Sequence, residues 1–344
     1  MTNILIIGAG SMGTAFSFPC SDNKHLTTIV GTHLEDNFID LINSTKIHPA
    51  LGCKIPPNVQ FLKYQNLSEA VNKAELIVVA VVSKGIEWVS DELSKTLKKN
   101  IPILILTKGL SIHAKNYEVL AHKMERLLKE KGVKETNISA AGGPCLAKGL
   151  ANKVHTSVVF ANSNIEIVKK FSKILSTDYY HIFISNDVVG VEISAAIKNI
   201  FSMAIGASEG LCHPNTSKEI RSNNYLNTAA SLLQQSLQEM IFFVEYLKGK
   251  KETVLSLAGI GDLYVSADGG RNSKMGYYIG QGMTYEEVKK SKMPNDTVEG
   301  VELIKEIGSK VKSDFAIKDL PVMIGMINAI LDKKELNIEW KNFI

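Results

Sequence analysis

The feature that most constrains this chain is a glycine-rich turn that begins at its eighth residue. The apolar run 4–7 leads directly into residues 8–13, GAGSMG, and a segment that can begin a helix follows. In such a strand–turn–helix the glycines permit a tight turn and a close approach of backbone to a pyrophosphate, which the helix N-terminus binds. The pattern therefore predicts a dinucleotide-binding turn. The residues expected to contact the cofactor there are Gly8, Gly10, Ser11, Met12 and Gly13.

Apolar and amphipathic segments alternate after this turn. Short apolar runs, typical of strands buried on both faces, occupy residues 4–7, 26–30, 76–82, 103–106 and 138–141. Segments with helical spacing lie between them, for example 86–97 and 119–128, and a further strand-like pair follows at 156–161 and 180–184. The alternation predicts a parallel sheet covered by helices, which is a doubly wound Rossmann domain.

The pattern changes after residue 185. Helical spacing dominates the rest of the chain, at residues 191–209, 227–247, 285–290, 298–311 and 320–331, and the polar stretch 213–224 reads as a loop. A chain of 344 residues is long enough for two cores. We therefore predict an α/β fold with an N-terminal Rossmann domain over residues 1–185, an all-α C-terminal substrate-binding domain over residues 186–344, and the active site in the cleft between them.

Composition narrows the possible classes of protein. The chain is 45% hydrophobic and 22% charged, values that are ordinary for a globular protein. Its net charge of +4 is not concentrated in a basic tract, so we expect no nucleic-acid partner. No apolar run approaches the length of a membrane span, and the four scattered cysteines form neither a CxxC pair nor a metal-ligand cluster. We expect a cytoplasmic protein without metal or membrane attachment.

Four further regions stand where an α/β fold places its chemistry: residues 107–110, 142–147, 191–199 and 259–272. The first three contain the strings TKGL, GGPCLA and AIKN, and the fourth contains GGRN and most of LAGIGDL, which begins at residue 257. In this order, covering nearly the whole chain, the strings resemble the NAD(P)-dependent glycerol-3-phosphate dehydrogenase family. The resemblance implies an oxidoreductase that transfers hydride reversibly between NAD(P)H and dihydroxyacetone phosphate. The product, sn-glycerol 3-phosphate, would feed glycerophospholipid synthesis.

Three residues are the candidates for catalysis. Reduction of a ketone needs a proton donor beside the developing alkoxide, and the apolar neighbours of Lys198 make an exposed helix face an unlikely setting for it. The resemblance gives Lys198 the same role. Lys108 follows a strand, where ligands of doubly wound sheets collect, and is expected to hold both substrate and cofactor. Asp262 would orient Lys198 or a substrate hydroxyl, unless it only caps the following helix.

The remaining site residues follow mainly from the resemblance. Arg271 and Asn272 would bind the substrate phosphate, since a guanidinium fork suits that group. The other expected substrate contacts are Gly143, Cys145, Asn199 and Gly270. Besides Lys108 and Arg271, the expected cofactor contacts beyond the glycine-rich turn are His33, Ala147, Thr297 and Glu299. The alternative to a cofactor contact for Glu299 is that it is simply an acidic residue at the start of a helix.

The sequence leaves the choice between NAD and NADP open. The second strand ends in Gly31-Thr32-His33 and lacks the acid that usually holds the ribose hydroxyls of NAD. No arginine lies there to bind the phosphate of NADP. Glu35 and Asp36 would serve the ribose if the turn folds back, and otherwise they are solvated loop acids.

Two positions depart from the family pattern. Cys145 stands where the family usually has serine or threonine, and Ala229 where it typically has a basic residue near the substrate phosphate. The alternatives are therefore a related dehydrogenase of another sugar phosphate, ketopantoate or another 2-hydroxy acid, or a catalytically silent dinucleotide-sensing protein. The long apolar helices of the second half favour a homodimer.

Overall fold

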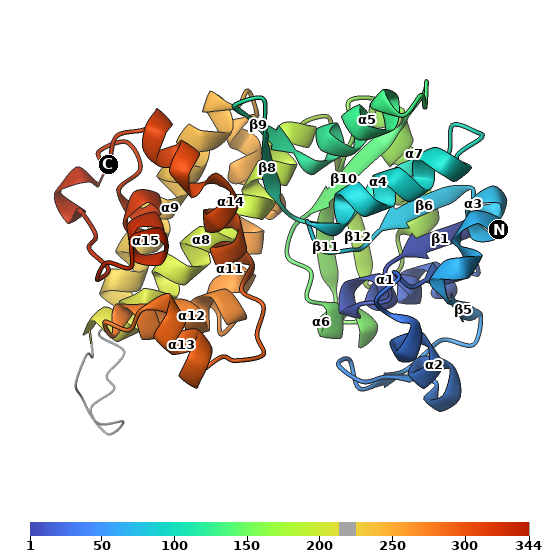
Figure 1. The fold of residues 1–344 in the computed structure, drawn as a ribbon, viewed down its shortest axis with the longest axis horizontal. Helices are drawn as coiled ribbons and strands as arrows, with labels where there is room; N and C mark the ends of the chain where they lie inside the picture. Colours follow the sequence, from blue (N-terminus) through green and yellow to red (C-terminus); the bar gives the residue numbers. More distant parts are fainter. Residues whose placement is uncertain (213–224, 344) are drawn as a thin grey trace. The chain divides into compact units, whose positions relative to one another are not determined.

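The computed structural model describes residues 1–212 and 225–343, which form two compact units (Figure 1). The first unit contains Met1–Lys108 and Glu118–Glu192, and the second contains Gly109–Tyr117 and Ile193–Ile344. The last passage from the first unit to the second follows Glu192 and so falls inside helix α8 (Val188–Cys212), close to the predicted boundary after residue 185. The predicted loop at 213–224 lies outside the described residues.

The first unit is built on an eight-stranded sheet with the order β12-β11-β10-β7-β6-β1-β2-β5. Its strands are β1 (Asn3–Ile7), β2 (Leu26–Val30), β5 (Val59–Leu62), β6 (Leu76–Val79), β7 (Ile103–Ile105), β10 (Ile138–Gly142), β11 (Thr156–Ala161) and β12 (Tyr180–Ser185). All neighbours pair in parallel except β10 and β11. The doubly wound Rossmann fold is confirmed, with β11 and β12 as an antiparallel addition at one edge.

The helices of the first unit cover this sheet. They are α1 (Ser11–Asp22), α2 (Asp36–Thr45), α3 (Leu67–Lys73), α4 (Gly85–Thr96), α5 (Leu120–Glu130), α6 (Ala147–Ala151) and α7 (Ile165–Leu175). A small hairpin of β3 (Ile47–His48) and β4 (Cys53–Lys54) follows α2. Helix α4 buries Ile86, Val89 and Leu93, one face of the helix, because apolar side chains recur there at spacings of three and four. Helices α4 and α5 pack together, as do α1 and α6.

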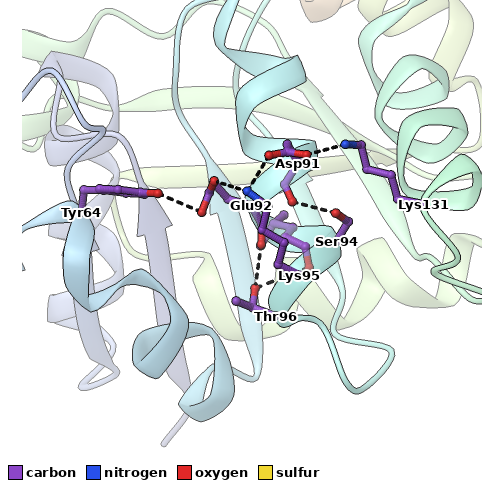
Figure 2. A network of polar contacts seen from close by, with 8 residues as sticks. Tyr64, Asp91, Glu92, Ser94, Lys95, Thr96 and Lys131 are labelled. Carbon is purple, nitrogen blue, oxygen red and sulfur yellow. Dashed lines mark hydrogen bonds and ion pairs between the residues drawn. The ribbon is translucent and has the colours of Figure 1, made fainter.

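An ion pair joins the exposed face of α4 to the end of α5, and a hydrogen bond joins α4 to the segment after β5 (Figure 2). The Lys95 ammonium lies 2.6 Å from Asp91 and 2.9 Å from Glu92, and Asp91 also pairs with Lys131. The hydrogen bonds from these two lysines lower the pKa of Asp91 to about 2. Glu92 accepts a hydrogen bond of 3.1 Å from the Tyr64 hydroxyl, which orients that ring.

The second unit consists mainly of helices. They are α8, α9 (Tyr225–Tyr246), α10 (Lys251–Val254), the π-helical turn η3 (Leu257–Gly261), α11 (Asp262–Ala267), α12 (Arg271–Gly280), α13 (Tyr285–Ser291), α14 (Glu299–Asp314) and α15 (Pro321–Leu331). The predicted helices are therefore all present. No strand occurs between residues 193 and 343 in the part of the chain that the structure describes.

A hairpin from the middle of the Rossmann sequence packs in the second unit. This exchange between the units was not predicted from the sequence. The strands of the hairpin are β8 (Leu110–His113) and β9 (Asn116–Val119), and β8 packs against α14. The ring of Tyr117 lies 5.2 Å from that of Phe243 and beneath the ammonium of Lys310. This long-range packing holds residues 109–117 against the helices.

Helix α8 is long and apolar enough to cross a membrane by length and composition alone. However, 94% of its most apolar window is buried inside the protein, as expected of a core helix.

Glycines let α8 and α12 cross with their backbones in contact. A β-carbon on Gly276 of α12 would lie 1.8 Å from the Met203 carbonyl oxygen of α8, and one on Gly280 would lie 2.3 Å from that of Ala207. The reverse holds as well, because a β-carbon on Gly206 of α8 would lie 2.2 Å from the Ser273 carbonyl oxygen. Only hydrogen atoms fit at these positions, and the two helices are therefore locked in one register.

The buried carboxylate of Glu239, on α9, caps another helix of the second unit. It accepts hydrogen bonds of 2.8 Å from the backbone NH groups of Val322 and Met323, in the first turn of α15. These groups have no partner within their own helix, so the carboxylate satisfies them across the fold. Burial raises the pKa of Glu239 to about 7 despite these hydrogen bonds.

Replacing this cap is expected to reduce stability. Glu239→Ala leaves two buried NH groups unsatisfied and should lower the free energy of unfolding by about 2 kcal/mol. Because the folded-state pKa of Glu239 is raised, its contribution to the free energy of unfolding should fall by roughly 1 kcal/mol per pH unit as the pH rises from about 5 to 7. The pH dependence of the variant should be weaker by this amount. Urea unfolding across this range measures both effects. The control is Glu245→Ala, on the exposed face of α9, and equal losses in the two variants would contradict the capping role.

Candidate active-site residues on each unit

The glycine-rich turn has the geometry that a dinucleotide requires. Gly8 has a φ of +106°, and a β-carbon there would lie 2.7 Å from the Ala80 carbonyl oxygen. A β-carbon on Gly13 would lie 2.3 Å from the Gly8 carbonyl oxygen, so α1 packs closely on the turn. Gly10 has no other group within 4 Å of its β position, which leaves open space in front of the backbone. It is also the N-cap residue of α1, so no N-cap side chain occupies the first NH groups of the helix. The turn therefore fits a pyrophosphate at the first NH groups of α1, those of Ser11 and Met12 included.

His33 lies in an aromatic cluster at the edge of the first unit. Its ring centroid is 5.2 Å from that of Trp88 on α4 and 6.4 Å from that of Tyr64. Tyr64 is the residue that Glu92 orients (Figure 2). The sequence analysis did not single out Trp88 or Tyr64, the two aromatic residues whose rings lie beside His33. The cofactor contact of His33 stays a prediction.

The structure brings Lys108 and Gly143 together in the first unit. The Lys108 ammonium donates a hydrogen bond of 3.4 Å to the Gly143 carbonyl oxygen. Gly143 has a φ of +111°, and its β-carbon would lie 3.2 Å from Val158 Cα, so the turn after β10 requires glycine. Cys145 is a half-buried thiol in that turn, and Ala147 begins α6.

The second unit pairs Lys198 with Asp262 in its interior. The two side chains are 8% and 1% exposed, and the Lys198 Nζ lies 2.5 Å from the Asp262 Oδ1. Lys198 also donates to the hydroxyl of Ser266, which in turn donates to the Asp262 carbonyl oxygen at 2.7 Å. The sequence analysis missed Ser266, whose signal was its spacing of four residues from Asp262 on one helix face.

Local backbone geometry explains the position of Asp262. The turn η3 precedes it, and a β-carbon on Gly259 would lie 2.0 Å from the Val254 carbonyl oxygen, so this tight π-helical turn accepts only glycine. The N-cap residue of α11 is Gly261, and Asp262 follows it in the first turn of the helix. Asp262 is therefore not the N-cap of α11. Its carboxylate is instead directed at Lys198. A buried ammonium needs such a compensating charge and hydrogen bonds, so the pair holds the lysine in one place.

A chain of hydrogen bonds links the other motifs of this unit. The Asn272 amide donates to the Asn199 Oδ1 at 2.9 Å, and the Asn272 Oδ1 accepts from the Gly300 NH at 2.9 Å. These contacts fix the Asn272 carboxamide, and the backbone NH of Asn272 lies in the first turn of α12. These hydrogen bonds connect α8, α12 and the start of α14. They hold Asn199, which is next to Lys198, in a fixed position.

Arg271 is the first residue of α12 and ion-pairs with Glu299, the first residue of α14. Both side chains are about half exposed, so the guanidinium remains accessible. Gly270 is the N-cap of α12, and Thr297 is exposed just before α14. The ion pair therefore brings the string GGRN together with residues 297–300, TVEG. Ala229, the second departure from the family pattern, is half-buried on α9.

The doubly wound sheet with its glycine-rich turn, together with a helical unit that buries a lysine on an aspartate, defines the class of NAD(P)-dependent dehydrogenases. Comparison with protein families gives the same result. Residues 3–168 match the model of the NAD-dependent glycerol-3-phosphate dehydrogenase N-terminus, and residues 187–339 match that of its C-terminus. The chain belongs to the NAD-dependent glycerol-3-phosphate dehydrogenase family.

Individual relatives agree with this assignment. The chain is 29% identical to the NADP(+)-dependent glycerol-3-phosphate dehydrogenase of Archaeoglobus fulgidus, over 92% of each chain. It is 28% identical to the glycerol-3-phosphate dehydrogenase [NAD(P)+] of an Exiguobacterium species, over 100% of this chain and 95% of the relative. The crystal structure of glycerol-3-phosphate dehydrogenase from Coxiella burnetii has a similar fold, with a TM-score of 0.81, 21% identity and coverage of 97% and 96%.

Proposed function

We propose that the protein interconverts dihydroxyacetone phosphate and sn-glycerol 3-phosphate with NAD(H) or NADP(H). The observation that carries this proposal is the buried Lys198, held by Asp262 and Ser266 in the same unit as Arg271 and the N-terminus of α12. A proton donor and a phosphate-binding group are the two functions that this substrate requires of the protein.

When held at the glycine-rich turn of Gly8, Gly10 and Gly13, the dinucleotide would supply the hydride-transfer chemistry of this reaction. Lys198 donates a proton to the ketone oxygen during reduction and takes it back during oxidation. Asp262 balances the charge of the buried ammonium and, with Ser266, orients its N–H bonds, so that the proton is delivered from a fixed direction. Lys108 keeps its predicted role toward cofactor and substrate, with Gly143 as the acceptor that positions its ammonium.

The start of α12 supports a phosphate contact. The backbone NH groups of its first turn lack helical partners, the helix dipole favours an anion there, and Arg271 adds a guanidinium. Glu299 holds Arg271 near its present position until a phosphate competes for it. The contacts proposed for Cys145 and Asn199 would complete the substrate site.

We test the function by following NADH and NADPH oxidation with dihydroxyacetone phosphate, dihydroxyacetone, ketopantoate and other ketose phosphates. Turnover is expected with dihydroxyacetone phosphate and not with its phosphate-free counterpart. Activity on another substrate alone would mean that Cys145 and Ala229 mark a changed specificity. No activity with any of them would favour the dinucleotide-sensing alternative.

Arg271→Ala should raise the KM for dihydroxyacetone phosphate by roughly 10- to 100-fold, since a charge-assisted hydrogen bond is lost. The KM for the dinucleotide should change much less if the main contact of Arg271 is with phosphate. Lys274→Ala, which removes an exposed positive charge from the same helix, is the matched control. An unchanged KM in Arg271→Ala would remove this residue from the phosphate site.

The proposal extends to the setting of the reaction. The enzyme would act in the cytoplasm as a homodimer, with a small phosphorylated substrate and without nucleic-acid or membrane partners. Its product would supply the glycerol backbone of phospholipids. Light scattering of the purified protein tests the dimer, and a monomeric mass would exclude it.

A further inference from the structure

The carboxylate of Glu35 is bonded to the glycine-rich turn itself. Its Oε2 accepts hydrogen bonds from the NH of Ala9, between the first two glycines, at 3.3 Å, and from the NH of Thr32 at 2.7 Å. The backbone NH of Glu35 donates to the Thr32 carbonyl oxygen at 3.0 Å, which closes the segment after β2 into a turn. The acid thus has a fixed place beside the residues that fit the pyrophosphate.

The structure also explains why this acid does not come from the strand. β2 ends at Val30, and an acid at about this point ordinarily binds the ribose of NAD. A β-carbon on Gly31 would lie 2.9 Å from the Ile39 Cγ1 and 3.3 Å from the Glu35 Cβ. Ile39 and the stem of Glu35 therefore fill the space of a side chain at the strand tip. The N-cap residue of α2 supplies the acid in its place.

The charges near this turn oppose a phosphate. The first arginine in the sequence is Arg126, so neither β2 nor α2 nor the segment between them contains the guanidinium that commonly binds the 2′-phosphate of NADP. Asp36 adds a negative charge to the first turn of α2. Lys63, the cation bonded to this helix, lies 2.7 Å from the Asp40 carboxylate.

We propose that Glu35 accepts a hydrogen bond from the 2′-hydroxyl of the adenosine ribose and so makes the enzyme select NAD(H) over NADP(H). A carboxylate accepts hydrogen bonds only, so it pairs with a hydroxyl donor and repels a phosphate that carries nearly two negative charges. The proposal rests on the proposed function in that it assigns the dinucleotide of that reaction. It goes further by naming the residue that chooses between the two cofactors.

The experiment is a titration of the purified protein with NADH and with NADPH, followed by nicotinamide fluorescence. The Kd for NADH should be at least about tenfold lower, because the site hydrogen-bonds one ligand and repels the other. Glu35→Gln keeps an oxygen that can accept from the turn and removes the charge, and should reduce this preference by about tenfold. The control is Asp40→Asn, which removes the same charge from the same helix and should change the preference less than about twofold. Thermal unfolding verifies that both variants are folded.

Two results would overturn the proposal: NADPH binding as tightly as NADH in the wild type, or the same preference in Glu35→Gln as in Asp40→Asn. The ratio of kcat/KM values for NADH and NADPH with dihydroxyacetone phosphate gives a second readout. If the expected binding preference is found but dihydroxyacetone phosphate is not reduced, the proposed function fails and the role of Glu35 stands. If dihydroxyacetone phosphate is reduced equally well with both cofactors, the role of Glu35 fails and the proposed function stands.

Discussion

Lys198→Ala is expected to reduce the kcat for dihydroxyacetone phosphate by roughly 10³-fold, the usual worth of a positioned general acid. The Kd for NADH should change less than about twofold, because the glycine-rich turn belongs to the other unit. Initial rates of NADH oxidation give the kcat, and a fluorescence titration gives the Kd for NADH. Turnover within tenfold of the wild type would remove Lys198 from the chemistry.

The alanine variant has one structural cost, since it leaves the buried Asp262 carboxylate without its cation. Lys198→Arg separates this effect from catalysis, because a guanidinium keeps the charge but does not release a proton near neutral pH. We expect it to stay folded and still lose turnover. Lys312→Met, which breaks only a surface ion pair with Asp332, should leave kcat unchanged. A fully active Lys198→Arg enzyme would show that charge alone is required.

Gly276→Ala is expected to cause the largest loss of stability. Its new methyl group would lie 1.8 Å from the Met203 carbonyl oxygen, which is backbone and cannot rotate away, so α8 and α12 must separate. Such overpacking should lower the free energy of unfolding by about 3 kcal/mol or more. Thermal unfolding should show a fall in Tm of roughly 6–12 °C, and kcat should fall as well because α8 carries Lys198.

The matched control is Gly149→Ala, in helix α6 of the first unit. Its nearest neighbours to a β-carbon, on Leu146 and Val154, are 4.0 Å away. The same substitution should therefore be neutral or stabilise by up to about 1 kcal/mol through helix propensity. A comparable loss in both variants would mean that the close crossing of α8 and α12 is not the cause.

The strands of the Rossmann sheet were predictable where apolar runs were continuous. β6 and β7 are apolar and buried throughout, and β1 is so from Ile4 to Ile7. β2 and β10 were also recognised, although they contain threonine and serine. The edge strand β5 has the sequence VQFL and buries only Phe61, and this weak pattern went unnoticed. The antiparallel direction of β11 depends on pairing with β10, which local sequence does not encode.

The site was predictable mainly through its motifs. The strings containing Lys198 and Asp262 marked the two residues that the fold brings within 2.5 Å across 64 positions of sequence. The pairing of Asn272 with Asn199 and Gly300, and of Arg271 with Glu299, was not visible beforehand. Such contacts depend on how separate helices cross, and residue types alone do not determine this.

The hairpin of β8 and β9 means that neither unit is one continuous stretch of polypeptide. The chain passes between the units three times, after Lys108, after Tyr117 and after Glu192. A fragment that starts at residue 186 would lack Tyr117 and expose the aromatic surface around Phe243 that this ring covers. Any truncated or chimaeric version of the helical unit must therefore carry residues 109–117 as a graft or as a permuted terminus.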